Sequence, residues 1–400
     1  MISYKCNVID RFGKKQKLKQ YADSKEELVY ILKKNNYIII EIKKIDNQLA
    51  NRLSKKIKSK DLAVFCKQLH SMLKAGITVT NSLKILKIQT NNKKFRIVIE
   101  KIYKDLLKGK NLSKAFLIYN EALPDLLISM IKVGELSGNL DNIMGSLSNY
   151  YEKENKIENK INSAMIYPAV LAFVSIVVVM FLLTSVMPNF IEMYLSSGVP
   201  LPTITKILIN VSEFIKNSWQ IILYFIIIFV FVISVLKKRK DVKFTIDYIK
   251  LKVPVYRNLQ LKIATFRFTR TLATLLRCGV PMLEALDTIS LVIENSYIGS
   301  KILKMKEDIK QGVSLSNQMK KQNIFPSMVH QMIRIGEDSG TIEEMLDKTA
   351  DFYDEEVEIA VQRLTILIEP LMIIIMSIII GFIVLAMAIP MFEMMQTVQY

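Results

Sequence analysis

Hydrophobic and polar positions form blocks along the chain, in which long polar segments alternate with uncharged apolar runs. The three uncharged runs cover residues 161–191, 217–236 and 370–392. Each run reaches the roughly 20 residues that a helix needs to cross about 30 Å of hydrocarbon. Helices buried in a soluble core rarely extend so far without a charge. The pattern therefore predicts three transmembrane helices.

Within the polar segments, apolar residues recur at the spacing of one helix face. From Leu62 to Leu73 they mark a first helix, which Gly76 ends because glycine adopts the left-handed conformation that a helix end requires. Further helices are expected at 80–89, 95–107 and 112–119, after Pro124, and from Asn139 through Tyr151. Six or so short helices separated by glycines indicate an antiparallel helical bundle.

The first 44 residues show a different pattern. Alternating apolar residues from Tyr4 to Val8 indicate a half-buried strand, and residues 18–21 can pair with it. A capping box at Ser24 opens a short helix, and residues 37–42 have the composition of a third strand. The sequence therefore predicts a small α/β module, which a Lys-rich linker joins to the rest of the chain.

The chain contains the same unit twice. Gly134-Glu135-Leu136-Ser137-Gly138 returns as Gly336-Glu337-Asp338-Ser339-Gly340. Pro168 and Pro370 have the same spacing of 202 residues, while Gly76 and Gly279, which end matching helices, are 203 residues apart. Such constant spacing indicates an internal duplication.

Repeats and apolar runs together predict an all-α polytopic membrane protein. It has two homologous cytoplasmic six-helix bundle domains, three transmembrane helices and the small α/β N-terminal module. The expected order is the module at 1–50, the first cytoplasmic repeat at 51–160, a transmembrane helix at 161–190, an external loop at 191–216, a transmembrane helix at 217–236, the second cytoplasmic repeat at 237–369, a transmembrane helix at 370–392 and an external tail at 393–400.

Basic residues set the expected orientation. Residues 1–160 contain 32 Lys and Arg against 16 Asp and Glu, whereas residues 192–216 contain two of each sign. Basic segments stay in the cytoplasm, so a multi-pass protein of the cytoplasmic (inner) membrane with its N-terminus inside is expected. Each repeat leads into its own span, and the one further span at 217–236 returns the chain to the cytoplasm, so both repeats have the same orientation. Residues 204–215 form an amphipathic face that is expected to lie on the outer membrane surface.

The net charge of +18 raises the question of nucleic-acid binding. The excess consists of scattered Lys residues rather than an Arg stripe interleaved with aromatic residues, so direct binding of nucleic acid is not expected. Attraction to anionic lipid headgroups is the favoured explanation.

The repeated turn places a carboxylate near a hydroxyl, an arrangement that catalysis could use. Glu135 and Glu337 have no His, Cys or second acid nearby in both copies, so neither a catalytic residue nor a cofactor site is predicted. Gly138 and Gly340 are instead expected to close a helix. The acids are expected to offer a repeated polar contact to a partner protein or between copies.

The other ionisable groups do not have the spacing that is typical of a metal site or a phosphate-binding loop. His70 and His330 do not occupy equivalent positions, so no metal site is predicted. Five acids between Asp351 and Glu358 could hold a divalent cation, but a solvated helix face is favoured because the glycine of a calcium loop is missing. Gly109 and Lys110 are not followed by the Ser or Thr of a phosphate loop.

Pro168 and Pro370 lie in or beside equivalent membrane runs. Proline frees a backbone carbonyl and bends a helix, so both positions are predicted to be sites of bending. The runs contain no charge, which argues against a carrier of ions or solutes.

Together these features resemble the GspF/PilC family of inner-membrane platform proteins of type II secretion and type IV pilus systems. The resemblance covers nearly the whole chain and rests on the helices ending at Gly76 and Gly279, both Gly-Glu-x-Ser-Gly turns, Tyr167-Pro168 and the Pro-Leu-Pro-Thr segment at 200–203. A departure is Glu369, which replaces the Tyr expected before Pro370.

The resemblance implies a non-enzymatic scaffold that couples a cytoplasmic hexameric assembly ATPase to the polymerisation of pilin or pseudopilin subunits. Other inner-membrane assembly proteins and further copies of the chain are implied partners. The alternative from another class is a multipass transporter or channel. Neighbouring genes for a secretion ATPase and prepilins would separate the two.

Overall fold

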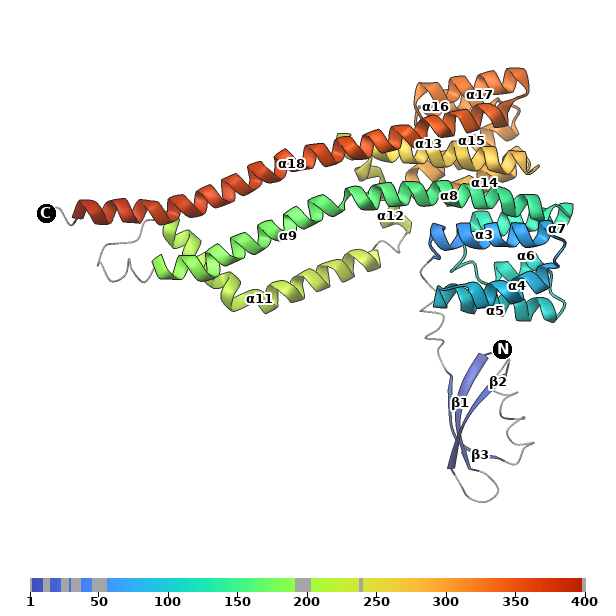
Figure 1. Cartoon of the computed structure of the whole chain (residues 1–400), viewed down its shortest axis with the longest axis horizontal. Coiled ribbons are helices and arrows are strands. Elements are labelled where there is room, and N and C mark those ends of the chain that lie inside the picture. The colour runs from blue at the N-terminus through green and yellow to red at the C-terminus, as the bar shows by residue number, and fades with distance from the viewer. Residues whose placement is uncertain are drawn as a thin grey trace. The chain divides into compact units, whose positions relative to one another are not determined.

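The structure is a computed structural model, which describes residues 2–9, 15–22, 29, 37–44, 56–190, 203–236 and 240–397 of the 400-residue chain. Packing divides the chain into two compact units, Met1–Met144 and Gly145–Tyr400. The boundary falls inside the last helix of the first repeat, so most of that helix packs within the second unit. Figure 1 labels the elements of both units.

The N-terminal residues form a three-stranded antiparallel sheet. Strands β1 (Ile2–Ile9), β2 (Lys15–Ala22) and β3 (Ile38–Lys44) lie in the order β2-β1-β3. Cys6 of β1 lies opposite Leu18 on one side and Ile42 on the other. The three predicted strands are thus confirmed. The helix predicted to begin at Ser24 lies, apart from Val29, outside the described residues.

Six helices of the first repeat follow in the described chain, and they confirm the helices predicted from the apolar spacing. They are α3 (Ser59–Lys74), α4 (Val79–Gln89), α5 (Lys93–Leu107), α6 (Leu112–Leu117), α7 (Asp125–Ser137) and α8 (Leu140–Ala164). The buried core is aromatic, since the Phe65 ring lies 5.1 Å from that of Phe95 and 6.4 Å from that of Phe116. Full burial of each such ring contributes about 1.5–3 kcal/mol to folding.

The second repeat contains the same helices in the same order, preceded by α12 (Lys240–Lys250). They are α13 (Pro254–Arg277), α14 (Met282–Val292), α15 (Ser296–Lys310), α16 (Leu315–Gln322), α17 (Ser327–Ser339) and α18 (Ile342–Thr397). Local contacts repeat as well. Asn92 caps α5 and Asn295 caps α15, each accepting hydrogen bonds from two backbone amides, so the duplicated sequence folds by the same local rules.

Two helical stretches of the described chain are long and apolar enough to cross a membrane, Leu140–Phe190 and Ile342–Ile389. In the first, α9 (Ile166–Phe181) and the π-helical turn η1 (Leu182–Val186) continue the direction of α8 (Figure 1). In the second, the single helix α18 runs from the second repeat through the whole apolar run.

The predicted surface segment and the second predicted span form one helix, α11 (Thr203–Leu236), which departs from helical geometry at Ser218. One stripe of its first half is buried, whereas Ile207 and Phe214 of the same half are exposed. The hydroxyl of Thr205 donates to the Ala386 carbonyl, and that of Ser212 donates to the Leu183 carbonyl, each at 2.7 Å. These bonds satisfy the two polar side chains, and the buried stripe also includes Leu208, which belongs to the apolar face expected on the membrane surface.

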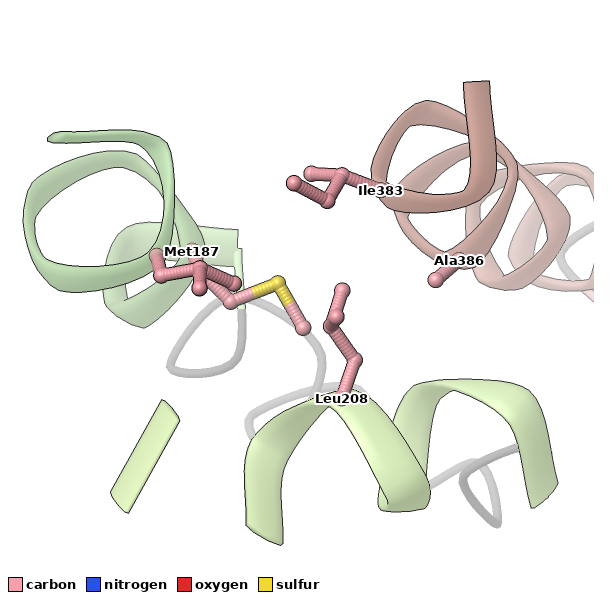
Figure 2. Packing of buried hydrophobic residues seen from close by; sticks show 5 residues of the cluster. Met187, Leu208, Ile383 and Ala386 are labelled. Carbon is pink, nitrogen blue, oxygen red and sulfur yellow. The ribbon is translucent and has the colours of Figure 1, made fainter. Parts of the chain in front are cut away.

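The stripe completes a small apolar core. Met187 follows η1, Leu208 comes from α11, and Ile383 and Ala386 come from α18, and their side chains point towards one another (Figure 2). Leu183 completes the cluster, in which every member is at most 5% exposed. The apolar ends of α9 and α18 are therefore tied together through the first half of α11.

Candidate functional site

The first glycine of each repeated turn allows two helices to meet. A Cβ atom on Gly336 of α17 would lie 2.7 Å from Cα of Ile342, where α18 begins. At the equivalent Gly134 of α7, a Cβ atom would lie 3.1 Å from Cα of Leu140 in α8. No larger residue fits without moving backbone, so these glycines set the entry of the chain into the long helices.

The acid of each turn caps the neighbouring short helix. The carboxylate of Glu135 accepts hydrogen bonds from the amide of Leu112 at 2.5 Å, and from the amide and hydroxyl of Ser113 at 3.1 and 2.5 Å. Glu337 accepts the same three bonds from Leu315 and Ser316 at the start of α16. A carboxylate at a helix N-terminus binds unpaired amides and complements the helix dipole. Both acids therefore hold their own domain together.

This environment also favours the charged form of Glu135. Partial burial on its own would raise the pKa of the carboxyl, but the hydrogen bonds from Ser113 and Leu112 outweigh burial and lower the pKa. The negative charge is thus part of the folded state at neutral pH. The side chain next to this acid, Leu136, is 78% exposed, and the turn residues that follow it are exposed as well, so a partner can reach this side of the turn.

The remaining glycines of the motifs end helices. Gly138 and Gly340 adopt left-handed conformations with φ of 68° and 71°, which confirms their predicted place at helix ends. Gly76 and Gly279 do the same after α3 and α13 with φ of 81° and 80°. Together with the capping acids, they give each repeat its sequence of sharp turns.

A buried ion pair, which the sequence analysis did not identify, joins the two repeats within the second unit. Arg267 of α13 contacts Glu154 of α8 at 2.5 Å, and both side chains are about nine-tenths buried. Burial alone would lower the pKa of the guanidinium, but the Glu154 and Glu294 carboxylates raise it, so Arg267 stays charged. Burial disfavours the charged form of Glu154 as well and therefore raises the pKa of its carboxyl, while the charge of Arg267 acts in the opposite direction.

The equivalent acid of the second repeat also binds α13. Glu356 lies 202 residues after Glu154 and contacts Lys262 at 2.5 Å. The equivalent acids of α8 and α18 are therefore both held by α13. The only sequence signal for this arrangement is the repeated pattern of two aromatic residues followed by acids, at Tyr150 and Phe352.

Helices α8 and α18 carry complementary charges where they face each other. Lys153 contacts Asp351 at 3.1 Å, and Lys160 contacts Asp354 at 3.1 Å and Glu358 at 2.8 Å. These acids therefore form ion pairs with α8 while part of the face stays in contact with solvent, since Asp351 and Glu358 are 58% and 46% exposed. In the described part of the chain, no three His, Cys, Asp or Glu side chains gather as a metal site.

The prolines differ in their effects on the two repeats. Near Pro168 the helix is interrupted between Ala164 and Ile166, and the Met165 amide divides its hydrogen bond between the carbonyls of Ile161 and Asn162, at 3.2 Å each. In contrast, α18 runs uninterrupted through Pro370. The irregularity expected at both prolines is present only in the first repeat.

Comparison with known proteins agrees with the duplication. The model of the family described as "Type II secretion system (T2SS), protein F" matches twice, at residues 65–188 and 268–390. The chain is 38% identical to a type IV pilus assembly protein PilC of Thermus thermophilus, over 84% of the chain and 83% of the relative. It is 33% identical to PilC of Pseudomonas aeruginosa, over 85% and 91%. A type II secretion system protein F of Vibrio cholerae is 26% identical over 98% of both chains.

We expect Gly336→Ala to destabilise the second repeat by about 1–3 kcal/mol, because the new methyl group meets backbone of α18 rather than a flexible side chain. Thermal unfolding of the purified full chain in detergent would measure the change. Gly381→Ala is the matched control, since a Cβ atom there would have no neighbour within 4 Å. Equal melting temperatures for Gly336→Ala and the wild type would show that the close approach is not required.

Replacing Glu135 by Gln should remove a stabilisation that depends on pH. A carboxyl whose folded pKa is lowered stabilises the protein above its unfolded pKa, and this contribution disappears as the pH falls through the folded value. The melting temperatures of wild type and variant should therefore differ at pH 7 and converge below about pH 4. The exposed Glu121→Gln is the control and should show no such gap. A gap that is constant with pH would contradict the proposed role of the charge.

Proposed function

This chain belongs to the type II secretion system protein F family (GspF/PilC), and we propose that it is a non-enzymatic platform protein of the inner membrane. In this role it couples a cytoplasmic hexameric assembly ATPase to the polymerisation of pilin or pseudopilin subunits, in a type IV pilus or a type II secretion system. The observation that carries the proposal is the double match of the family model, which covers both repeats together with their apolar runs.

The use of the repeated acids supports a scaffold rather than an enzyme. Glu135 and Glu337 each bind three groups of their own domain. The larger set of charges, around Arg267 and Lys160, joins helices to one another. Side chains engaged in this way provide a rigid body on which other proteins can exert force.

We further infer three membrane spans, with the N-terminal module and both repeats in the cytoplasm. Residues 161–190 and 370–392 provide two spans, and the second half of α11, residues 217–236, provides the third. Each repeat is followed by one span. If both repeats lie on the same side of the membrane, an odd number of further spans must lie between these two. The basic excess of residues 1–160 supports a cytoplasmic location for that side.

The ATPase is proposed to bind the first repeat, because the basic excess lies there. Lys84 of α4 and Lys108 after α5 are exposed, and such side chains attract an acidic partner surface. Other inner-membrane assembly proteins, anionic lipid and further copies of the chain are the remaining proposed partners.

Loss of the chain should abolish surface filaments or secretion of the corresponding substrates, and the full-length protein in membranes should bind the assembly ATPase of the same system. Lys84→Glu combined with Lys108→Glu should weaken this binding about tenfold, because two attractive charges become repulsive. Lys304→Glu with Lys320→Glu in the second repeat is the control. Filaments and secretion that persist without the chain would contradict the proposed function. Equal binding of the ATPase by both double variants would show that the ATPase binds at another surface.

The proposed topology predicts the location of reporters fused within the chain. Fusions after Lys110 and Lys304 should report from the cytoplasm, because each lies in a helical repeat, and a fusion after Ser197 should report from outside. A periplasmic alkaline phosphatase and a cytoplasmic fluorescent protein at each position would measure this. An external signal at Lys304 would exclude the parallel arrangement of the repeats.

A further inference from the structure

The two apolar helices that follow the repeats enclose a groove. It lies between α9 and α18 and has a volume of about 520 Å³. Its walls pair equivalent residues of the two repeats, Leu171 with Ile373, Val174 with Met376 and Ser175 with Ser377, each 202 residues apart, and a fourth pair follows one turn later. The groove therefore has an internal twofold symmetry and extends over about 10 Å of each helix.

Contacts close the groove at both ends. At the outer end, the core of Met187, Leu208 and Ile383 fills the space between the helices (Figure 2). At the cytoplasmic end, the hydroxyl of Tyr167 donates to the Glu369 carboxylate at 3.2 Å. Between these closures the walls are open, and Val174 and Ile373 are 50% and 55% exposed. An occupant therefore enters from the side, out of the bilayer.

The charge at the cytoplasmic end indicates what kind of occupant fits. Glu369 is exposed and places a carboxylate where membrane-spanning helices carry their Lys and Arg residues. An anionic lipid headgroup would be repelled at the same place. The hydroxyl-bearing Ser175 and Ser377 in the middle are small, and small residues allow helix backbones to approach closely. An apolar helix with a cationic cytoplasmic end fits the apolar walls, the small serine residues in the middle and the carboxylate at the end.

We propose that this groove binds the membrane-spanning helix of the subunit that the platform assembles, and that Glu369 pairs with a Lys, an Arg or an amino terminus at the cytoplasmic end of that helix. This inference rests on the proposed function, because it takes the pilin or pseudopilin subunit as the occupant. The pairing would leave Tyr167 in place as the second hydrogen-bonding partner of the carboxylate.

Filling the groove tests the proposal in cells. Val174→Trp and Ile373→Trp place large rings inside it, whereas Ile176→Trp and Ile374→Trp place them on other, lipid-exposed positions of the same helices, and all four positions are at least 50% exposed. We expect the groove variants to lower filament or pseudopilus formation about tenfold at normal protein abundance, as a loss of ~1.4 kcal/mol in binding would. The two control variants should assemble normally. Equal assembly by all four variants would overturn the proposal.

Cross-linking identifies the occupant. A photoreactive benzophenone side chain at Met376 in the full-length protein should form an adduct with the pilin or pseudopilin subunit, recognised by an antibody to that subunit. Glu369→Lys should reduce this adduct about tenfold, and changing the cationic residue at the cytoplasmic end of the subunit helix to Glu should restore it. Adducts with lipid only, or with a second copy of the chain, would overturn the proposal.

These outcomes are distinct from failure of the proposed function. If deleting the chain leaves filaments and secretion intact, the platform role is wrong. If deletion abolishes them while the groove variants and Glu369→Lys assemble and cross-link normally, the platform role stands and only the groove is excluded.

Discussion

The buried pair of Glu154 and Arg267 is the contact on which the organisation of the second unit depends. It places the last helix of the first repeat against the first long helix of the second, and Glu356 and Lys262 repeat this contact from α18. Removing one member of a buried pair costs about 3–5 kcal/mol, because a charge is left without a partner. The ion pairs between α8 and α18 add to the alignment of these two helices, which α13 contacts through Arg267 and Lys262.

The helices and turns of the repeats could be predicted from the sequence because they are encoded locally. Apolar spacing gave α3 to α8, and Gly138 and Gly340 marked helix ends where a left-handed conformation is needed. The partners of Glu135 and Glu337 could not be predicted in this way. Each acid reaches back more than 20 residues to a helix that folding brings near it, and the apolar pattern contains no information about that distance.

The apolar region was predicted less completely than the repeats. Its long apolar helices could be predicted from length and charge alone, but the inward packing of one stripe of α11 depends on two hydroxyls that donate to carbonyls of distant helices, at Leu183 and Ala386. The two prolines look equivalent in sequence, yet only Pro168 accompanies an interrupted helix. Within a membrane, tertiary contacts decide how a freed carbonyl is satisfied, and these contacts differ between the copies.

The contact between Tyr167 and Glu369 has a consequence for symmetry. The two residues hold the same position in their repeats, so they meet on the local symmetry axis of α9 and α18. The apolar wall pairs, such as Leu171 with Ile373, differ only in shape, whereas one carboxylate opposite one phenol makes the two helices differ in charge. The two helices therefore present different polar groups at equivalent positions, so a molecule that binds between them meets a carboxylate on α18 and a phenol on α9.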